Sequence, residues 1–189
     1  MASRWGILCP GPSLSKHNPF LYDIDFTVAV NGAILDPQFC PDYWAMCDLE
    51  VFASCVKEYE CWSPRIKLWI PARWLDDVKP ESALYNAFQK FEKETFPSET
   101  NEAFAATMPF KNDILWRERT LFIAIGQAIK KGAKEIWILG ADMAGRGYFR
   151  EGLENSRTRH TEKRWEEEIY WFNRIVKVCA EQGITVIKE

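Results

Sequence analysis

The chain has 189 residues, 47% hydrophobic and 27% charged, which is enough apolar surface for one folded core and excludes a disordered or low-complexity chain. Its formal net charge of -3 disfavours nonspecific nucleic-acid binding. The six cysteines form no C-x-x-C pair, and there is no signal peptide and no apolar run near the roughly 20 residues of a membrane span. We therefore expect a cytoplasmic protein with reduced thiols and no membrane association.

The first apolar runs of the chain indicate two buried strands. Residues 5–9 are apolar up to the cluster Pro10-Gly11-Pro12, which neither a strand nor a helix interior accepts. Ser13 then has the chemistry of an N-cap for a short helix. Residues 26–30 are apolar on both faces and rich in β-branched side chains, which predicts a buried strand that delivers Asn31 to a loop.

The middle of the chain is less regular. Strands are predicted over 43–47 and 66–71, with a helix over 49–57 between them and Asp48 as its N-cap. The stretch 73–113 shows no clear period, and we interpret it as a lid that faces an acceptor or as an insertion.

The last third of the chain shows the clearest periodicity. Apolar residues recur at helical spacing between 117 and 131, and residues 135–140 then indicate a buried strand. A long helix is predicted from near Thr161 to Gly183, followed by a strand over 184–187. Because strands alternate with helices along residues 1–189, we predict a single-domain, Rossmann-like α/β fold with a mostly parallel sheet flanked by helices.

Three predicted strand ends carry residues suited to ligand binding. In parallel sheets, ligands bind beyond the carboxyl ends of the strands, where glycine turns present backbone N–H groups to anions. The predicted ends are the turn of Gly11, Pro12 and Ser13, the amide of Asn31, and the segment that begins at Asp142. The last of these continues into Gly145-Arg146-Gly147-Tyr148, whose arginine and phenol could clasp a phosphate leaving group.

His160 is the predicted catalytic base, because its imidazole can deprotonate a hydroxyl near neutral pH and it directly precedes the last long helix. The D-x-D motif Asp23-Ile24-Asp25 precedes its strand, so it should face the opposite edge of the sheet and is not expected to hold a metal. The sequence contains neither a P-loop motif nor a G-x-G-x-x-G motif.

Three segments of the chain resemble bacterial lipooligosaccharide sialyltransferases. They are the turn Gly11-Pro12-Ser13-Leu14, the helix-to-strand unit that ends in Ile138 to Asp142, and a histidine just ahead of the terminal helix and strand. These enzymes use a CMP-activated sugar, and their wider relatives include archaeal hydroxymethylpterin pyrophosphokinases. The resemblance implies a variant of the GT-A fold and a metal-independent reaction without a cofactor.

The resemblance also implies roles for single residues. His160 matches the general base, Asn31 a nucleotide contact, Thr120 a residue near the donor, and Tyr148 one of two tyrosines that stabilise the departing phosphate. The chain departs from the family where Pro10 replaces an asparagine of the turn and where the second tyrosine is missing near Ala144. Arg146 could supply the charge that this tyrosine would have offset.

Together these patterns predict a glycosyltransferase that moves a sugar from a CMP- or UDP-sugar to an acceptor hydroxyl. Its catalytic residues are His160, Tyr148 and Arg146, and its donor-binding residues are Gly11, Pro12, Ser13, Asn31, Thr120 and Asp142. The sequence leaves three acceptors open, which are a glycan, a small molecule and a modified DNA base. The DNA base is included because so compact an enzyme suits a phage or mobile element. Assembly of the chain into a homo-oligomer is also left open.

Two alternatives stay open beside the glycosyltransferase. The first is pyrophosphate transfer from ATP with Mg²⁺ held by carboxylates such as Asp48 or Asp142. The second is a catalytically idle module that binds a nucleotide. Dependence on Mg²⁺ separates the first alternative from the glycosyltransferase, and binding without turnover identifies the second.

Overall fold

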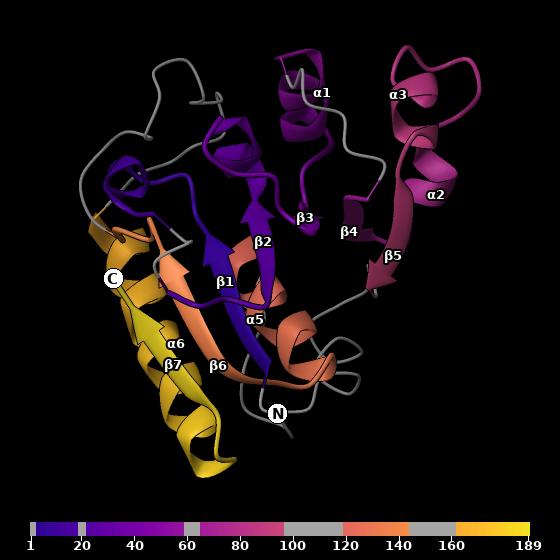
Figure 1. Cartoon of the computed structure of the whole chain (residues 1–189). Coiled ribbons are helices and arrows are strands. Elements are labelled where there is room, and N and C mark those ends of the chain that lie inside the picture. The colour runs from indigo at the N-terminus through magenta and orange to yellow at the C-terminus, as the bar shows by residue number, and fades with distance from the viewer. Residues whose placement is uncertain (1–2, 19–21, 59–64, 97–118, 144–161) are drawn as a thin grey trace.

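The computed structural model describes residues 3–18, 22–58, 65–96, 119–143 and 162–189 (Figure 1). The strands are β1 (Ser3–Leu8), β2 (Phe26–Val30), β3 (Tyr43–Ala45), β4 (Lys67–Pro71), β5 (Glu92–Phe96), β6 (Ala133–Leu139) and β7 (Thr185–Lys188). The helices are the 3-10 helices η1 (Pro12–Lys16) and η3 (Asn31–Leu35), and the α-helices α1 (Leu49–Glu58), α2 (Trp74–Asp77), α3 (Tyr85–Gln89), α5 (Thr120–Lys130) and α6 (Glu162–Glu181).

All of these strands join one sheet in the order β5-β4-β3-β2-β1-β6-β7, and every neighbouring pair is parallel. Helices flank this sheet, so the protein has the Rossmann-like α/β fold predicted from the alternation of strands and helices. No helix in the described part of the chain is long and apolar enough to cross a bilayer.

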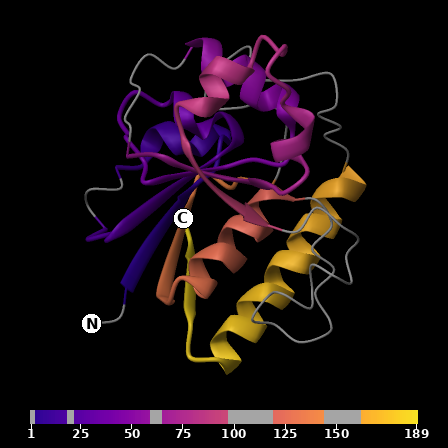
Figure 2. The ribbon, with the colours of Figure 1, turned by 90° about the vertical axis from the view of Figure 1, so that its right-hand side faces the viewer.

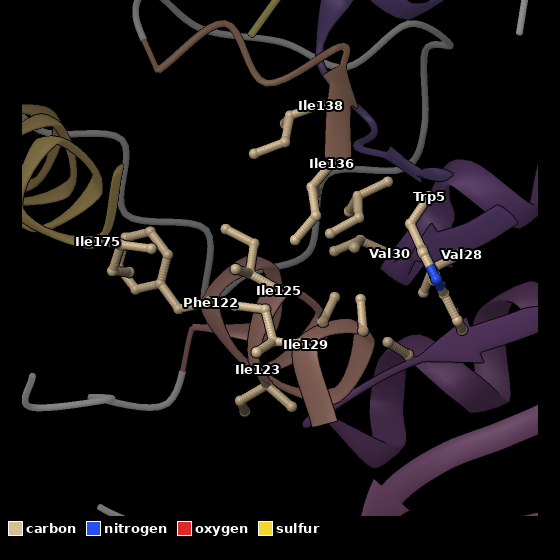
Figure 3. Close-up of a cluster of buried hydrophobic side chains, with 14 of the residues drawn as sticks. Trp5, Val28, Val30, Phe122, Ile123, Ile125, Ile129, Ile136, Ile138 and Ile175 are labelled. Atoms are coloured by element: carbon tan, nitrogen blue, oxygen red, sulfur yellow. The ribbon is translucent and has the colours of Figure 1, made fainter. Parts of the chain in front are cut away.

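The core lies in two layers, one on each face of the sheet. Alternate residues of a strand point to opposite faces, so Trp5 and Ile7 pack against α5 while their neighbour Leu8 packs on the other side. Figure 3 shows the first layer, in which Phe122 and Ile125 of α5 meet side chains of β1, β2 and β6. Complete burial of side chains of this size stabilises the fold by about 2 kcal/mol each.

The helices divide between these two layers according to their place in the chain. Buried residues of η1, η3, α1, α2 and α3 belong to one layer, and those of α5 and α6 belong to the other. Figure 2 shows α5 and α6 running beside each other. The helices before β5 therefore cover one face of the sheet, and the helices after β5 cover the other. This change of face leaves the carboxyl ends of the strands on either side of it open to a ligand.

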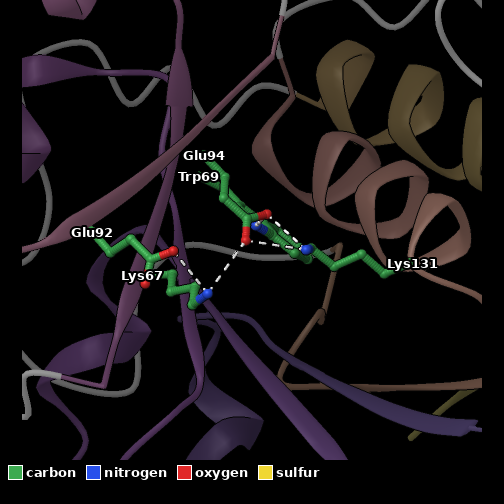
Figure 4. A network of polar contacts seen from close by, with 5 residues as sticks. All are labelled: Lys67, Trp69, Glu92, Glu94 and Lys131. Carbon is green, nitrogen blue, oxygen red and sulfur yellow. Dashed lines mark hydrogen bonds and ion pairs between the residues drawn. The ribbon is translucent and has the colours of Figure 1, made fainter.

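The interpretation of 73–113 as a lid or insertion is wrong for its first part, since α2, α3 and β5 lie within residues 74–96. β5 is an edge strand with mostly polar residues, which hid it from a search for apolar runs. Its polar side chains form the network of Figure 4, in which Glu94 lies 2.8 Å from the Lys131 amine and accepts a hydrogen bond from the Trp69 indole at 3.1 Å. Lys67 pairs with Glu92 at 2.8 Å.

The D-x-D motif lies at the amino edge of the sheet, as predicted. Asp25 accepts a hydrogen bond from the backbone N–H of Arg4 at 2.8 Å, and Asp23 pairs with the Arg4 guanidinium at 2.8 Å. Both carboxylates therefore hold the start of β1. Asp48 also behaves as predicted, because its carboxylate accepts the N–H of Glu50 in the first turn of α1.

Candidate functional site

The winding of the sheet reverses at β1. From β1 the chain proceeds through β2, β3 and β4 to β5 in one direction, and it then returns through α5 to β6 on the other side of β1. Since the connections before and after this return lie on opposite faces, the carboxyl ends of β1 and β6 form a topological switch point. Ligands of open α/β sheets bind at such a point.

Backbone hydrogen bonds hold the two chain segments together beyond these strand ends. The N–H of Cys9 donates to the carbonyl of Leu139 at 2.8 Å, and the N–H of Gly11 donates to the carbonyl of Gly140 at 2.9 Å. A Cβ at Gly11 would come closer than 3.0 Å to both the Gly140 carbonyl and the Asp142 carboxylate. Glycine is thus required at this position by close approach, since its backbone angles at φ -73° and ψ 162° suit any residue.

The carboxylate of Asp142 bridges the two segments a third time, because its Oδ2 accepts the N–H of Ser13 at 3.0 Å. Pro12 has no N–H, and the N–H of Leu14 donates to the carbonyl of Gly11 at 3.0 Å. Every backbone N–H from Gly11 to Leu14 therefore has a protein acceptor. The prediction that Ser13 is the N-cap of a short helix is wrong, because Gly11 holds the N-cap position of η1 and Ser13 lies within that helix.

Asn31 lies at the carboxyl end of β2, the strand beside β1, and has the left-handed backbone angle φ 51°. It begins η3 and not the loop that the sequence predicted. Its carbonyl accepts the indole N–H of Trp44 at 2.8 Å, but its side-chain Oδ1 is buried and has no hydrogen-bond partner in the described part of the structure. A buried amide oxygen without a partner is costly, so it needs an explanation such as strain, a bound water or ion, or a ligand.

Comparisons with family models, with curated proteins and with solved structures found no match. Of the predicted site residues, Gly11, Pro12, Ser13 and Asp142 meet at the ends of β1 and β6, while Asn31 lies at the end of the adjacent strand. The predicted catalytic residues, which are Arg146, Tyr148 and His160, lie outside the described residues.

Thr120 is the first residue of α5 and is 8% exposed. A helix that leads into a parallel strand runs opposite to it, so the start of α5 lies at the carboxyl edge of the sheet. The preceding residue, Arg119, pairs with the Glu168 and Glu167 carboxylates of α6. These ion pairs join the starts of α5 and α6 at this edge; the sequence analysis missed them, because nothing in the order of residues pairs side chains that are 49 positions apart.

Cys9 lies at the end of β1 beside this site, but its thiol is unsuited to nucleophilic chemistry. Complete burial, and next the negative charge of Asp142, raise the pKa of the Cys9 thiol to about 12. A thiol with such a pKa is protonated at neutral pH and is a poor nucleophile. Among the described residues, no three carboxylate, histidine or cysteine side chains gather in a way that could hold a metal ion.

One cavity, of about 330 Å³, lies away from the switch point. Its lining residues come from the end of α6 and the start of β7, at the amino edge of the sheet, and most of them are apolar. It contains no charged side chain, whereas the ends of β1, β2 and β6 bring together a carboxylate and an unsatisfied amide. The switch point is therefore the better candidate for a functional site.

Proposed function

We propose that the chain is a transferase that binds a nucleotide-activated donor across the carboxyl ends of β1, β2 and β6 and moves a sugar from it to an acceptor hydroxyl. The observation that carries this proposal is the buried Oδ1 of Asn31, which has no partner in the described part of the structure. Leaving such an oxygen without a hydrogen bond costs about 1–3 kcal/mol. A nucleotide that donates an amino or hydroxyl hydrogen to Asn31 would offset this cost on binding.

The fold supports a donor site at this position. The four segments at this edge are the turn from Gly11 to Ser13, the start of η3 at Asn31, the start of α5 at Thr120 and the loop at Asp142. A ligand that touches all four spans both sides of the switch point, as nucleotides do in related architectures. Likeness of architecture suggests a nucleotide but does not choose the reaction, so the choice of sugar transfer rests on the residues and resemblance described from the sequence.

In the proposed reaction, His160 takes the proton of the acceptor hydroxyl as its oxygen forms a bond to the anomeric carbon of the donor sugar. The bond between that carbon and the phosphate oxygen breaks, and the nucleotide leaves with the electron pair. Tyr148 and Arg146 stabilise the negative charge on the departing phosphate through hydrogen bonds.

Calorimetric titration with CMP, UDP, GDP and ATP, each with and without Mg²⁺, tests the donor site in the wild type and in Asn31→Ala. We expect metal-independent binding of CMP or UDP that Asn31→Ala weakens about 10-fold or more, as for the loss of one hydrogen bond in a buried site. Asp23→Ala is the matched control, because Asp23 has the same φ of 51° but lies at the amino edge. It should cause the same backbone strain and leave nucleotide binding unchanged.

The other outcomes reject the glycosyltransferase in distinct ways. Binding of ATP alone, and only with Mg²⁺, would favour pyrophosphate transfer. Nucleotide binding without sugar transfer, unchanged in the variant His160→Ala, would indicate a binding module without catalytic activity. Equal binding by the wild type and Asn31→Ala would remove the observation on which the proposed site rests.

A further inference from the structure

We infer that Asp142 is a specificity-determining residue that accepts hydrogen bonds from adjacent hydroxyls of the donor, and that the donor's phosphate lies away from the turn at Gly11. The ligand chemistry is a vicinal diol, as on a ribose. This inference rests on the proposed nucleotide-donor function and deepens it, because it states which part of the donor meets the ends of β1 and β6.

The first support is the position of the Asp142 carboxylate. It lies against Gly11 so closely that no Cβ fits between them, and its Oδ2 receives the N–H of Ser13 at 3.0 Å. The place that an anionic group of a ligand would take at this turn is therefore already filled by an anionic group of the protein. A donor that approaches the strand ends meets this carboxylate and not a row of free amides.

The second support is electrostatic. A carboxylate and a phosphate placed close together repel each other, and the repulsion is stronger at a protein surface than in bulk water because the effective dielectric constant is lower. The turn supplies no free N–H to offset that repulsion, since Gly11 and Leu14 donate to backbone carbonyls. The phosphate is thus disfavoured at this place, whereas a hydroxyl, which brings a hydrogen to donate, is favoured.

The third support is the unused oxygen of the same carboxylate. Oδ1 of Asp142 has no hydrogen-bond partner among the residues that the structure describes, and Asp142 as a residue is only partly buried. Hydrogen bonds from hydroxyls to a carboxylate are short and roughly twice as strong as those between neutral groups. Two neighbouring hydroxyls can share the oxygens of one carboxylate, as in sites where an acidic residue binds a ribose.

Asp142→Asn separates binding of the ligand from support of the turn. The amide oxygen can still accept the N–H of Ser13, while the amide nitrogen takes the place of Oδ1 and can no longer accept a hydroxyl hydrogen. The turn should therefore keep its structure, and the melting temperature should stay close to that of the wild type. Asp142→Ala, which loses both bonds, should melt at a lower temperature and is the control for the structural role.

The probes are CMP and its 2′,3′-dideoxy analogue, titrated into the wild type and Asp142→Asn. We expect the wild type to bind CMP about 10- to 100-fold more tightly than the dideoxy analogue, the range for one or two charge-assisted hydrogen bonds. Asp142→Asn should lower the affinity for CMP by a similar factor and leave that for the dideoxy analogue unchanged. Because CMP carries no transferred sugar, this pattern assigns the hydroxyls to the ribose.

Equal affinity of the wild type for the two probes would overturn the inference and leave the proposed donor site standing. Equal weakening of both probes by Asp142→Asn would also overturn it, since the carboxylate would then act only on the turn. If no nucleotide binds the wild type in the wider titration with CMP, UDP, GDP and ATP, the proposed function fails and the inference fails with it.

Discussion

Replacing Gly11 with alanine should separate the carboxyl ends of β1 and β6. The added Cβ would lie within 3.0 Å of the Gly140 carbonyl oxygen and of the Asp142 carboxylate, and neither group can give way cheaply. One is backbone, and the other is held by the N–H of Ser13. Since the backbone angles of Gly11 are allowed for alanine, the destabilisation comes from this overlap, and it is offset in part because alanine restricts the unfolded chain more than glycine does.

The expected loss of stability follows from the bonds that the overlap breaks. The hydrogen bond from Gly11 to the Gly140 carbonyl is of the neutral kind, worth about 0.5–1.5 kcal/mol, and the bond from Ser13 to the Asp142 carboxylate is worth about 1.5–3 kcal/mol. Their loss lowers the free energy of unfolding by about 2–4 kcal/mol. For a domain of this size, that corresponds to a fall in melting temperature of about 5–15 °C.

Thermal and urea denaturation of Gly11→Ala, followed by circular dichroism, measures this loss. Gly6→Ala, within β1, is the control, because its Cβ would meet only the Ile24 side chain, with the terminal Cδ1 nearest at 2.6 Å; it should cost much less. Combining Gly11→Ala with Asp142→Ala should cost less than the sum of the two, since one of the overlapping groups is gone. A melting temperature of Gly11→Ala within 1 °C of the wild type would refute the reasoning.

Three further predictions concern other parts of the molecule. Because burial raises the pKa of Cys9 to about 12, iodoacetamide at pH 8 should label the exposed Cys40 and not Cys9, as peptide mass spectrometry can show. The contribution of the protonated Cys9 thiol to the free energy of unfolding should be present below pH 9 and lost as the pH rises toward 12. Arg119→Ala should lower the free energy of unfolding, measured in urea, by about 2 kcal/mol, because Glu168 then lacks one of its arginine partners. The double variant Arg119→Glu with Glu168→Arg should recover part of the lost free energy. Glu94→Gln should cost about 0.5–1 kcal/mol at low salt, and a urea titration at 1 M NaCl should show a smaller difference from the wild type.

The strands that the sequence predicted correctly are the central ones, which are buried, and the short edge strand β7, which follows the glycine at the end of the last helix. The predicted strands 26–30 and 135–140 contain the uninterrupted apolar runs 28–30 and 136–139, because helices cover both sides of the central sheet. β5 was missed because it lies at the edge, where Glu92 and Glu94 pair with lysines instead of packing in a core. Local patterning reports burial, so it finds central strands more readily than edge strands.

The candidate site was predictable in its location but not in its internal bonding. Glycine turns and polar residues after apolar runs pointed to Gly11, Asn31 and Asp142, and the structure places all three at the carboxyl edge. The bond between Asp142 and Ser13 joins residues 129 positions apart, and the order of strands that brings them together is a property of the whole sheet. That bond uses a backbone N–H of the turn that the sequence analysis had assigned to the donor.

The central place of β1 in the sheet has a consequence for synthesis on the ribosome. Its neighbours are β2, which follows within about twenty residues, and β6, which begins only at Ala133. A nascent chain can therefore assemble β1 to β5 while the other edge of β1 still lacks a partner and its apolar face still lacks α5. Such an unpaired edge is open to wrong pairing, and it stays unpaired until β6 has been synthesised.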